Sequence, residues 1–401
     1  MKINFKNLLR KFLLYILIFS MIYQSGSVLA ALQLSTPIVQ ISRILILVIP
    51  FFFISNIKDL KNSFYILIFM LLGSFISFQL YNSSIIRLLY KIITLLLFFY
   101  VCSYTYRKNL NLNKIVYNVI YIISIITLIF YITTRIFHIE IPFNYAQSGD
   151  SYYYKNCFDI YFYCESDQLL PRLNGLFWEP GVYSIFLNLE LFLYFFSEDI
   201  SKKKQQLFII LVSLILTQSA AGYCVMALII YTYLSSTKYF TKKSRTLIAI
   251  YLALILVIMI GFILITKRNT DTVDLANYSY GLRVSDLLNG LQLFIAHPIF
   301  GLGYGNNHLF IANDIFGRGS SNGLVSWMYM TGLYGTTFAL YPFIANIKAN
   351  KSARGIQLLW FLMVIIFNTC EPLYSLPIMQ FLLAREYHQM FTHRKIINKN
   401  Q

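Results

Sequence analysis

The sequence predicts an all-α fold, that of a polytopic membrane protein with about twelve transmembrane helices and two long outer loops. Of its 401 residues, 58% are hydrophobic and only 12% are charged. Apolar runs of roughly 16 to 22 residues recur from one end of the chain to the other, close to the length that a helix needs to cross a bilayer. A transmembrane barrel would instead show alternating segments of about 10 residues, and the sequence has none.

The twelve expected spans occupy most of the chain, which we treat as a single integral membrane domain over residues 1–401. In chain order they lie near residues 12–32, 37–55, 63–80, 85–104, 114–134, 180–197, 205–218, 220–236, 246–266, 321–345, 355–371 and 376–391. Most connections between spans are short. The exceptions are segments 135–178 and 267–320, which are predicted to form two long loops on the same side of the membrane.

The placement of the basic residues predicts the topology. A formal net charge of +17 would suggest nucleic acid as the partner of a soluble protein. Here, however, 22 of the 33 Lys and Arg residues fall in alternate gaps between the spans, starting with the N-terminal tail. Because cytoplasmic loops retain basic residues, both termini are expected in the cytoplasm and both long loops outside it. No nucleic-acid partner is expected.

Two features leave alternatives open. The basic N-terminal tail and the apolar run that ends in S-V-L-A-A fit a cleaved signal peptide as well as an uncleaved first span. Cys157 and Cys164 both lie in the first outer loop. An oxidising compartment would permit a disulfide between them, and two separate thiols are the alternative.

Charged residues inside the predicted spans are candidates for substrate binding. Arg43 lies well inside the second span, and Arg87 and Lys91 lie near the outer end of the fourth. Charges at such depth usually face the protein interior or a wet cavity. The alternative is that the long basic side chains reach out to the lipid headgroups. Glu190 falls near the middle of the sixth span and needs a partner or a proton.

The segment from Arg172 to Gly181, R-L-N-G-L-F-W-E-P-G, joins the first outer loop to the sixth span. Glu179 precedes Pro180, a residue suited to the first position of a helix. Its carboxylate is expected either to stabilise the positive end of the helix dipole or to act as a general base at the membrane surface. The fork-shaped guanidinium of Arg172 suits a pyrophosphate, and an ion pair or phospholipid contact is the alternative.

The second outer loop contains a predicted amphipathic helix over residues 281–296. One face carries the apolar residues Leu287, Leu288, Leu291, Phe294 and Ile295, and another carries Arg283, Asp286 and Asn289. If the two outer loops fold together, Arg283 would hold a pyrophosphate jointly with Arg172. An ion pair or phospholipid contact is again the alternative for Arg283.

A glycine run, G-L-G-Y-G-N-N-H, follows this helix, with Gly301, Gly303 and Gly305 at alternate positions. It follows no predicted strand, so it does not indicate a dinucleotide site. We expect it to form a flexible or tightly turned backbone close to a ligand. His308 at its end is a candidate for substrate binding, although a lone histidine in such a loop is more often structural.

Taken in order, these motifs resemble the O-antigen polymerase (Wzy) and O-antigen ligase superfamily of bacterial envelope glycosyltransferases. The resemblance covers most of the chain. It is carried by R-L-N-G-L-F-W-E-P-G, L-T-Q-S-A-A-G, Arg283 followed by H-P-I-F-G-L-G-Y-G, and S-N-G-L-V-S-W-M-Y-M-T-G-L-Y-G. Ligases of the superfamily usually carry His-Asn where this chain has Ser321-Asn322, and this departure favours a polymerase.

The resemblance implies transfer of a saccharide from undecaprenyl pyrophosphate to a hydroxyl acceptor at the periplasmic face of the inner membrane. It implies neither metal nor cofactor. Expected partners are the undecaprenyl-pyrophosphate-linked oligosaccharide, membrane lipid, a chain-length regulator and a flippase. Arg172 and Arg283 match the arginines that the family uses for pyrophosphate.

The catalytic base stays open at this point. Glu179 is the first candidate, with Asp286 or His308 as alternatives. The catalytic set expected from the sequence is Glu179, Arg172 and Arg283, and the substrate-binding set is Arg43, Arg87, Asp286, His308 and Asn322. A ligase, or a flippase or other transporter of lipid-linked saccharides, is the alternative function. A structural envelope-assembly protein is a third interpretation.

Overall fold

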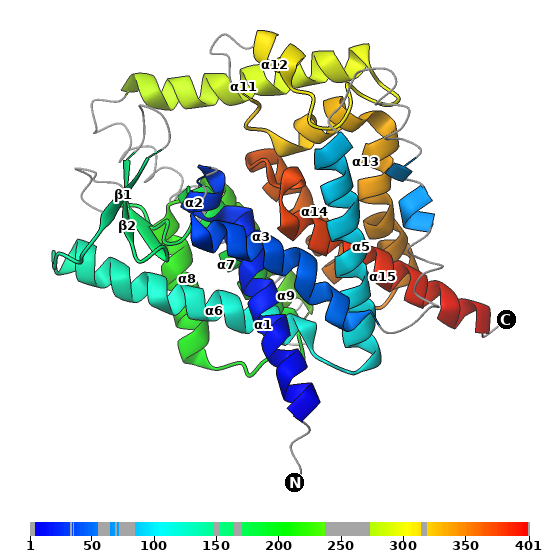
Figure 1. The fold of residues 1–401 in the computed structure, drawn as a ribbon, viewed down its shortest axis with the longest axis horizontal. Coiled ribbons are helices and arrows are strands. Elements are labelled where there is room, and N and C mark those ends of the chain that lie inside the picture. The colour runs from blue at the N-terminus through cyan, green and yellow to red at the C-terminus, as the bar shows by residue number, and fades with distance from the viewer. Residues whose placement is uncertain are drawn as a thin grey trace. The chain divides into compact units, whose positions relative to one another are not determined.

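The computed structural model describes residues 5–32, 34, 36–54, 65–68, 70–71, 85–147, 153–163, 171–236, 273–313 and 319–399. The described chain is mostly helical (Figure 1). It divides into two compact units, each made of two stretches of chain. The first unit comprises Met1–Leu45 and Asn111–Ala276, and the second comprises Ile46–Leu110 and Asn277–Gln401.

The first unit is built around helix α7 (Pro180–Phe196), which is buried on all faces from Val182 to Tyr194. A helix that is apolar all round is expected in a protein interior or a membrane. The other helices of this unit are α1 (Phe5–Gly26), α2 (Val28–Ala31), the start of α3 (Pro37–Val48), α6 (Leu112–Tyr131), α8 (Lys204–Thr217) and α9 (Ala220–Ser236). Of these, α6, α8 and α9 pack directly against α7, and α1 packs against α6.

Small residues bring α9 close to α7. A Cβ atom added at Gly222 of α9 would lie 2.7 Å from the Cβ atom of Ser184 of α7. The amide of Asn188 donates across the same contact, to the carbonyl oxygen of Gly222 at 3.0 Å. The T-Q-S-A-A-G-Y turn between α8 and α9 therefore permits close helix packing, as membrane helices commonly achieve with small residues.

A small antiparallel sheet in the first outer loop departs from the all-α prediction. Its strands are β1 (Asn144–Gln147), β2 (Tyr153–Cys157) and β3 (Tyr161–Tyr163), in the order β1-β2-β3. Tyr145 pairs with Lys155, and Cys157 with Tyr161. Strands of three to five residues carry too little alternation to be recognised in a tyrosine-rich segment.

The second unit contains α5 (Ile85–Arg107), which packs along α15 (Pro377–Lys399). The remaining elements are η1 (Ile49–Phe53), most of α11 (Val273–Ala296), α12 (His308–Asn313), α13 (Gly323–Ala349), α14 (Arg354–Cys370) and η3 (Leu373–Ser375). Helix α13 packs against both α14 and α15.

Helix α13 is broken at Gly332, where φ is 62° and ψ is −165°. At the break, backbone N–H and carbonyl groups of α13 lose their partners within the helix. The segment after α11 forms hydrogen bonds with these groups. The N–H groups of Leu302 and Gly303 donate to the carbonyl oxygens of Tyr329 and Met330, at 2.8 and 2.9 Å. In return, the N–H groups of Leu333 and Tyr334 donate to Pro298 and Ile299. Irregular backbone at membrane depth is tolerated where protein groups satisfy it in this way.

The glycine run forms tight turns, as predicted. Gly301, Gly303 and Gly305 have φ values of 65°, 91° and 79°, in the left-handed region that favours glycine. Gly301 also lies against the backbone of α13, because an added Cβ atom would be 2.6 Å from the Thr331 nitrogen. These glycines allow the loop to lie directly against the broken part of α13.

The predicted amphipathic helix over 281–296 exists as part of α11, but its buried face is not the one that its leucines suggest. Asp286, Gly290 and Leu293 are buried, whereas Leu288 is 55% exposed and Ile295 is 73% exposed. The reason is contact with α13: a Cβ atom on Gly290 would clash with Val325. The apolar face points outward, as in helices that lie at a lipid surface.

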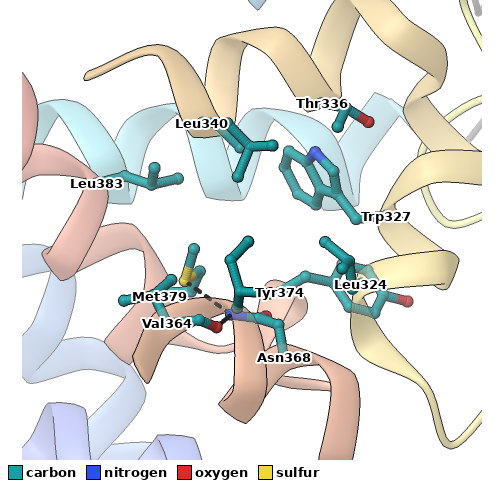
Figure 2. A pocket seen from close by; sticks show the side chains of 11 residues that line it. Leu324, Trp327, Thr336, Leu340, Val364, Asn368, Tyr374, Met379 and Leu383 are labelled. Carbon is teal, nitrogen blue, oxygen red and sulfur yellow. Dashed lines mark hydrogen bonds between the residues drawn. The ribbon is translucent and has the colours of Figure 1, made fainter. Parts of the chain in front are cut away.

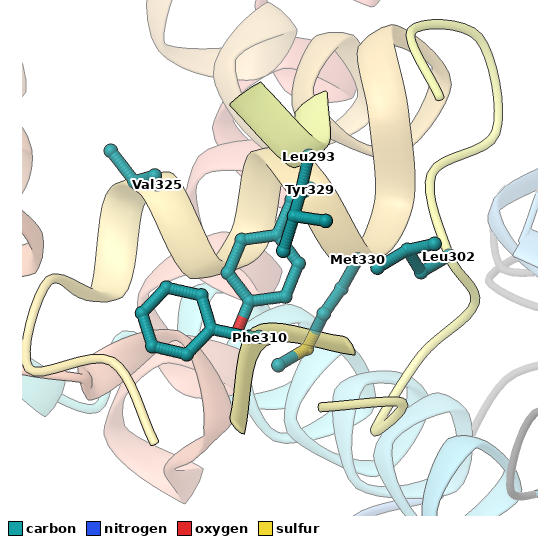
Figure 3. Packing of buried hydrophobic residues seen from close by; sticks show 6 residues of the cluster. All are labelled: Leu293, Leu302, Phe310, Val325, Tyr329 and Met330. Carbon is teal, nitrogen blue, oxygen red and sulfur yellow. The ribbon is translucent and has the colours of Figure 1, made fainter. Parts of the chain in front are cut away.

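A compact hydrophobic cluster fixes α11, α12 and the glycine run on α13. Figure 3 shows its six buried residues: Leu293, Leu302, Phe310, Val325, Tyr329 and Met330. The Phe310 and Tyr329 rings stack with centroids 5.3 Å apart. This packing defines how α11, α12 and the glycine run lie against the start of α13.

Three helical segments among the described residues are long and apolar enough to cross a membrane: Asn7–Gly26, Leu88–Arg107 and Leu112–Ile136. Five apolar helical segments are shorter: Pro37–Phe53, Pro180–Phe196, Lys204–Thr217, Ala220–Ser236 and Arg354–Cys370. The fourteen residues of α8, for example, extend only about 21 Å, less than the roughly 30 Å hydrocarbon core. Predicted span 246–266 lies outside the described residues, as does most of 63–80. The number of twelve spans therefore stays a prediction.

Candidate functional site

The segment that joins the first outer loop to α7 is held by hydrogen bonds from several elements of the first unit. The Phe162 N–H of β3 donates to the carbonyl oxygen of Gly175 at 2.7 Å. Trp178 N–H donates to Gly26, where α1 ends, and Val28 N–H donates to Leu176. The Tyr154 hydroxyl donates to the Trp178 carbonyl at 2.7 Å. Residues 172–179 therefore form a rigid connection.

Arg172 is half-buried beside the C-terminus of α8. Its Nε and Nη2 atoms donate to the carbonyl oxygens of Thr217 and Gln218, at 3.2 and 3.4 Å. Gln218 ends α8 in the left-handed conformation, with φ of 49°. A guanidinium at this position interacts favourably with the negative end of the helix dipole. The orientation of Arg172 is thus set by α8.

Glu179 occupies the N-cap position of α7, with Pro180 at the first helical position, as the sequence predicts. Its side chain is exposed and makes no capping hydrogen bond. An N-cap side chain usually accepts from the N–H groups of the first turn. The Glu179 carboxylate is therefore not used for capping, and it lies at the positive end of the α7 dipole.

The sheet of the first loop combines basic groups with aromatic rings. The Lys155 ammonium lies 4.4 Å from the Phe143 ring centroid, and the Arg135 guanidinium lies 4.8 Å from that of Tyr163. Cys157, on β2, is a fully buried free thiol, and Cys164 lies outside the described residues. Burial raises the pKa of the Cys157 thiol, and nearby Lys155 acts in the opposite direction.

The basic residues predicted inside spans differ in placement. Arg43 lies on the exposed side of α3, where its Nε donates to Gln24 Oε1 of α1 at 3.2 Å. Arg43 is thus exposed and not packed in the interior, and the choice between a wet cavity and the lipid headgroups stays a prediction. Arg87 lies in α5, and its side chain is outside the described residues. Lys91, one turn later, is buried as expected.

Glu190 is fully buried between helices of the first unit. The Ser124 hydroxyl of α6 donates to its Oε2 at 3.1 Å, and its Oε1 has no hydrogen-bond partner among the described residues. The hydroxyl of Tyr183, two turns earlier on α7, is also buried without a hydrogen bond in the described chain. The Glu190 carboxyl and the Tyr183 hydroxyl therefore lie inside the packed helices, away from the loops.

In the second unit, Asp286 joins α11 to the start of α13. It is 1% exposed, and its Oδ2 accepts hydrogen bonds from the N–H and the hydroxyl of Ser321, at 2.8 and 2.6 Å. Arg283, one turn earlier on α11, has an exposed side chain. The structure thus brings together an acid from the predicted helix and the Ser-Asn motif at the start of span ten.

Asn322 and His308 lie at the beginnings of helices. Asn322 is the N-cap of α13, and its Oδ1 accepts from Val325 N–H at 3.1 Å. His308 opens α12, is exposed, and contacts Asn306 Oδ1 through Nδ1. Both positions fit a structural role, and the predicted substrate contacts of these residues stay predictions.

Lys91 of α5 is a functional candidate that the sequence marked only by its depth in a span. Its Nζ donates to the carbonyl oxygen of Tyr374 at 3.2 Å. It also lies 4.1 Å from the Tyr304 ring centroid and 5.3 Å from that of Tyr374. These contacts place Lys91 directly against the glycine run. The tyrosine partners could not be inferred from spacing along the chain.

Two hollows lie between helices of the second unit. The smaller has a volume of about 20 Å³, room for one water molecule, and Trp327, Asn368 and Tyr374 are among its lining residues. Figure 2 shows it, with the hydrogen bonds from Asn368 Nδ2 to the Val364 carbonyl and Met379 sulfur. The larger, about 310 Å³, is lined mostly by aromatic side chains, including Phe338, Tyr341 and Tyr387.

Arg172 belongs to the first unit and Arg283 to the second, so the predicted convergence of their guanidinium groups stays a prediction. Within the described ranges, no group of three or more His, Cys, Asp or Glu side chains could hold a metal ion.

The described residues form a mainly helical protein with apolar helices long enough to cross a membrane. No family model matches the chain, and no curated protein is significantly similar to it.

Proposed function

We propose that the protein is a polymerase. It joins undecaprenyl-pyrophosphate-linked oligosaccharide repeat units into O-antigen or capsular polysaccharide at the periplasmic face of the inner membrane. The observation that carries this proposal is the exposed carboxylate of Glu179. This side chain occupies the N-cap position of α7 but makes no capping hydrogen bond. It stands at the end of a rigid segment that also carries Arg172.

The proposed roles follow from this chemistry. Glu179 removes the proton from an acceptor hydroxyl, whose oxygen attacks the anomeric carbon of the donor saccharide. The new glycosidic C–O bond forms as the bond from that carbon to the lipid pyrophosphate breaks. Arg172 and Arg283 stabilise the negative charge that the leaving pyrophosphate acquires.

The surroundings of Asp286 and His308 make both residues weaker candidates for the catalytic base than Glu179. Asp286 is buried, and its Oδ2 already accepts two hydrogen bonds from Ser321. His308 lies beside Asn306 in a structural turn. Glu179 remains the first candidate because its carboxylate is exposed.

The chemistry at the start of α13 favours a polymerase over a ligase. The superfamily's ligases usually place a histidine where this chain has Ser321. The Ser321 hydroxyl donates to Asp286 and cannot replace an imidazole as a base. A flippase would be expected to show an internal repeat, which the sequence lacks.

The test is deletion of the gene, followed by labelling of surface glycans. A polymerase defect leaves single-repeat material on the surface. Polymer that accumulates without its final attachment would indicate a ligase, and units trapped inside would indicate a flippase. Complementation with Glu179→Gln should fail to restore long chains, whereas complementation with the unaltered gene should restore them.

A further inference from the structure

Lys91 is a basic residue in the interior of the second unit. Only 6% of its surface is exposed, and its contacts are one carbonyl oxygen and two tyrosine rings. The short distance to the Tyr304 ring is typical of a cation held over an aromatic face.

None of these contacts neutralises the charge. A carbonyl oxygen and aromatic rings supply partial negative charge only, and no carboxylate of a described residue forms an ion pair with Lys91. A buried ammonium without an anionic partner lowers stability. A protonated Lys91 would therefore need an anion from outside the described residues.

The surroundings of Lys91 are mainly aromatic. Tyr304 belongs to the glycine run, whose left-handed glycines let the backbone approach closely. Tyr304 and Trp327 lie 6.2 Å apart between ring centroids, and Trp327 and Tyr374 lie 5.9 Å apart. These rings pack around Lys91 and are largely buried themselves, since Tyr304 is 7% and Trp327 is 8% exposed. Lys91 and the three rings come from four separate parts of the second unit.

We propose that Lys91 is an anion-binding residue of the substrate site, with Tyr304 and Tyr374 holding its ammonium in place. The ligand is an anionic group of the lipid-linked saccharide, either a phosphate of the carrier or a carboxylate of an acidic sugar. This inference rests on the proposed function, because that function supplies the anionic substrate.

The test uses the purified full-length protein in detergent and measures its thermal unfolding midpoint. Inorganic pyrophosphate and glucuronate are the two probes, each compared with sodium chloride of equal ionic strength. A midpoint raised by pyrophosphate identifies a phosphate site, and one raised by glucuronate identifies a carboxylate site. If neither probe raises the midpoint of the unaltered protein, the proposal is wrong.

Lys91→Met should reduce the shift, whereas Lys348→Met, which removes an exposed lysine of α13, should leave it intact. Without probe, Lys91→Met should unfold at the same or a higher temperature, because it removes an unpaired buried charge. A lower midpoint, or failure to fold, would show that Lys91 is structural and would overturn the proposal. A probe-induced shift that Lys91→Met leaves unchanged would also overturn the proposal.

This result is independent of the glycan phenotype. If deletion of the gene leaves long chains intact, the proposed polymerase function fails even when Lys91 binds an anion. If the glycan phenotype is as expected but Lys91→Met binds the probe normally, only the role of Lys91 fails.

Discussion

Arg172 is oriented by a helix end, and this orientation bears on its proposed role in substrate binding. Its two bonds to the last carbonyls of α8 fix the plane of the guanidinium, so a bound phosphate would meet a pre-oriented donor. Arg283, by contrast, is exposed on α11 and owes its position to the helix alone.

Replacement of either arginine by alanine is expected to abolish long-chain polymer while the protein still inserts into the membrane. Loss of a charge-assisted contact to the leaving group should lower the rate by about 100-fold or more. The measurement is the chain-length distribution of surface glycan in a complemented deletion strain. Arg354→Ala, at an exposed arginine of α14, is the matched control and should give normal polymer. Normal polymer from both outer-loop variants would refute the assignment.

The position of Glu190 near the middle of a helix was predictable from the sequence, but its hydrogen bond with Ser124 was not. Glu190→Gln should leave the unfolding midpoint unchanged or raise it, because the amide oxygen can still accept from Ser124 and no charge needs burial. Glu190→Ala should cost about 1–3 kcal/mol, because the Ser124 hydroxyl loses that acceptor. Thermal unfolding of the two variants tests this. A glutamine variant as unstable as the alanine variant would show that an ionised carboxylate is required.

Cys157 offers a pH-dependent prediction for the first outer loop. Because burial raises its pKa, the reactive thiolate is a smaller fraction at neutral pH than for an exposed thiol. In a variant that keeps Cys157 and replaces the other four cysteines with serine, maleimide labelling should be slow at pH 7. The rate of labelling should increase by up to about tenfold for each unit by which the pH is raised above 7. Rapid labelling at pH 7 would contradict the buried placement.

At the scale of elements, the break in helix α13 explains why glycines are needed in residues 301–305. Backbone groups freed near Gly332 pair with residues 298–303, and this pairing requires left-handed glycines in close contact with α13. The glycine spacing predicted a tight turn, but nothing in the sequence indicated that the turn would complete a broken helix.

Gly301→Ala should destabilise the protein by about 1–2 kcal/mol from backbone strain alone, with a further cost from the contact with Met330 and Thr331. Gly355→Ala is the control. It lies in α14 with open space around it, so alanine should stabilise the helix by about 0.5–1 kcal/mol. Chemical or thermal unfolding in detergent measures both. A Gly301 variant as stable as the unaltered protein would contradict this account of the loop.

Helix positions were the most predictable elements, because apolar runs mark them directly. The fourth and sixth predicted spans, 85–104 and 180–197, correspond to α5 and α7 within a few residues. The buried face of α11 was not predictable, because in a membrane protein the apolar side can face lipid while Asp286 faces the protein. The short sheet was missed because three- to five-residue strands leave little pattern.

At the scale of the whole molecule, the candidate site was partly predictable. The segment from Arg172 to Glu179 is hydrogen-bonded to several elements of the first unit, and Ser321 of the Ser-Asn motif contacts Asp286 in the second. The pairing of Lys91 with Tyr304 and Tyr374 was not foreseeable, since it joins parts of the chain more than 200 residues apart. The convergence of Arg172 and Arg283 depends on the arrangement of the two units and stays a prediction.

The central claim is that this chain polymerises lipid-linked repeat units. The most direct measurement incubates the purified protein in detergent with the undecaprenyl-pyrophosphate-linked repeat unit and separates the products by size. The claim predicts a ladder of products at integral multiples of one unit, which disappears with Arg172→Ala. Folded protein that yields only the single unit, or a ladder that persists in the Arg172 variant, would contradict the account.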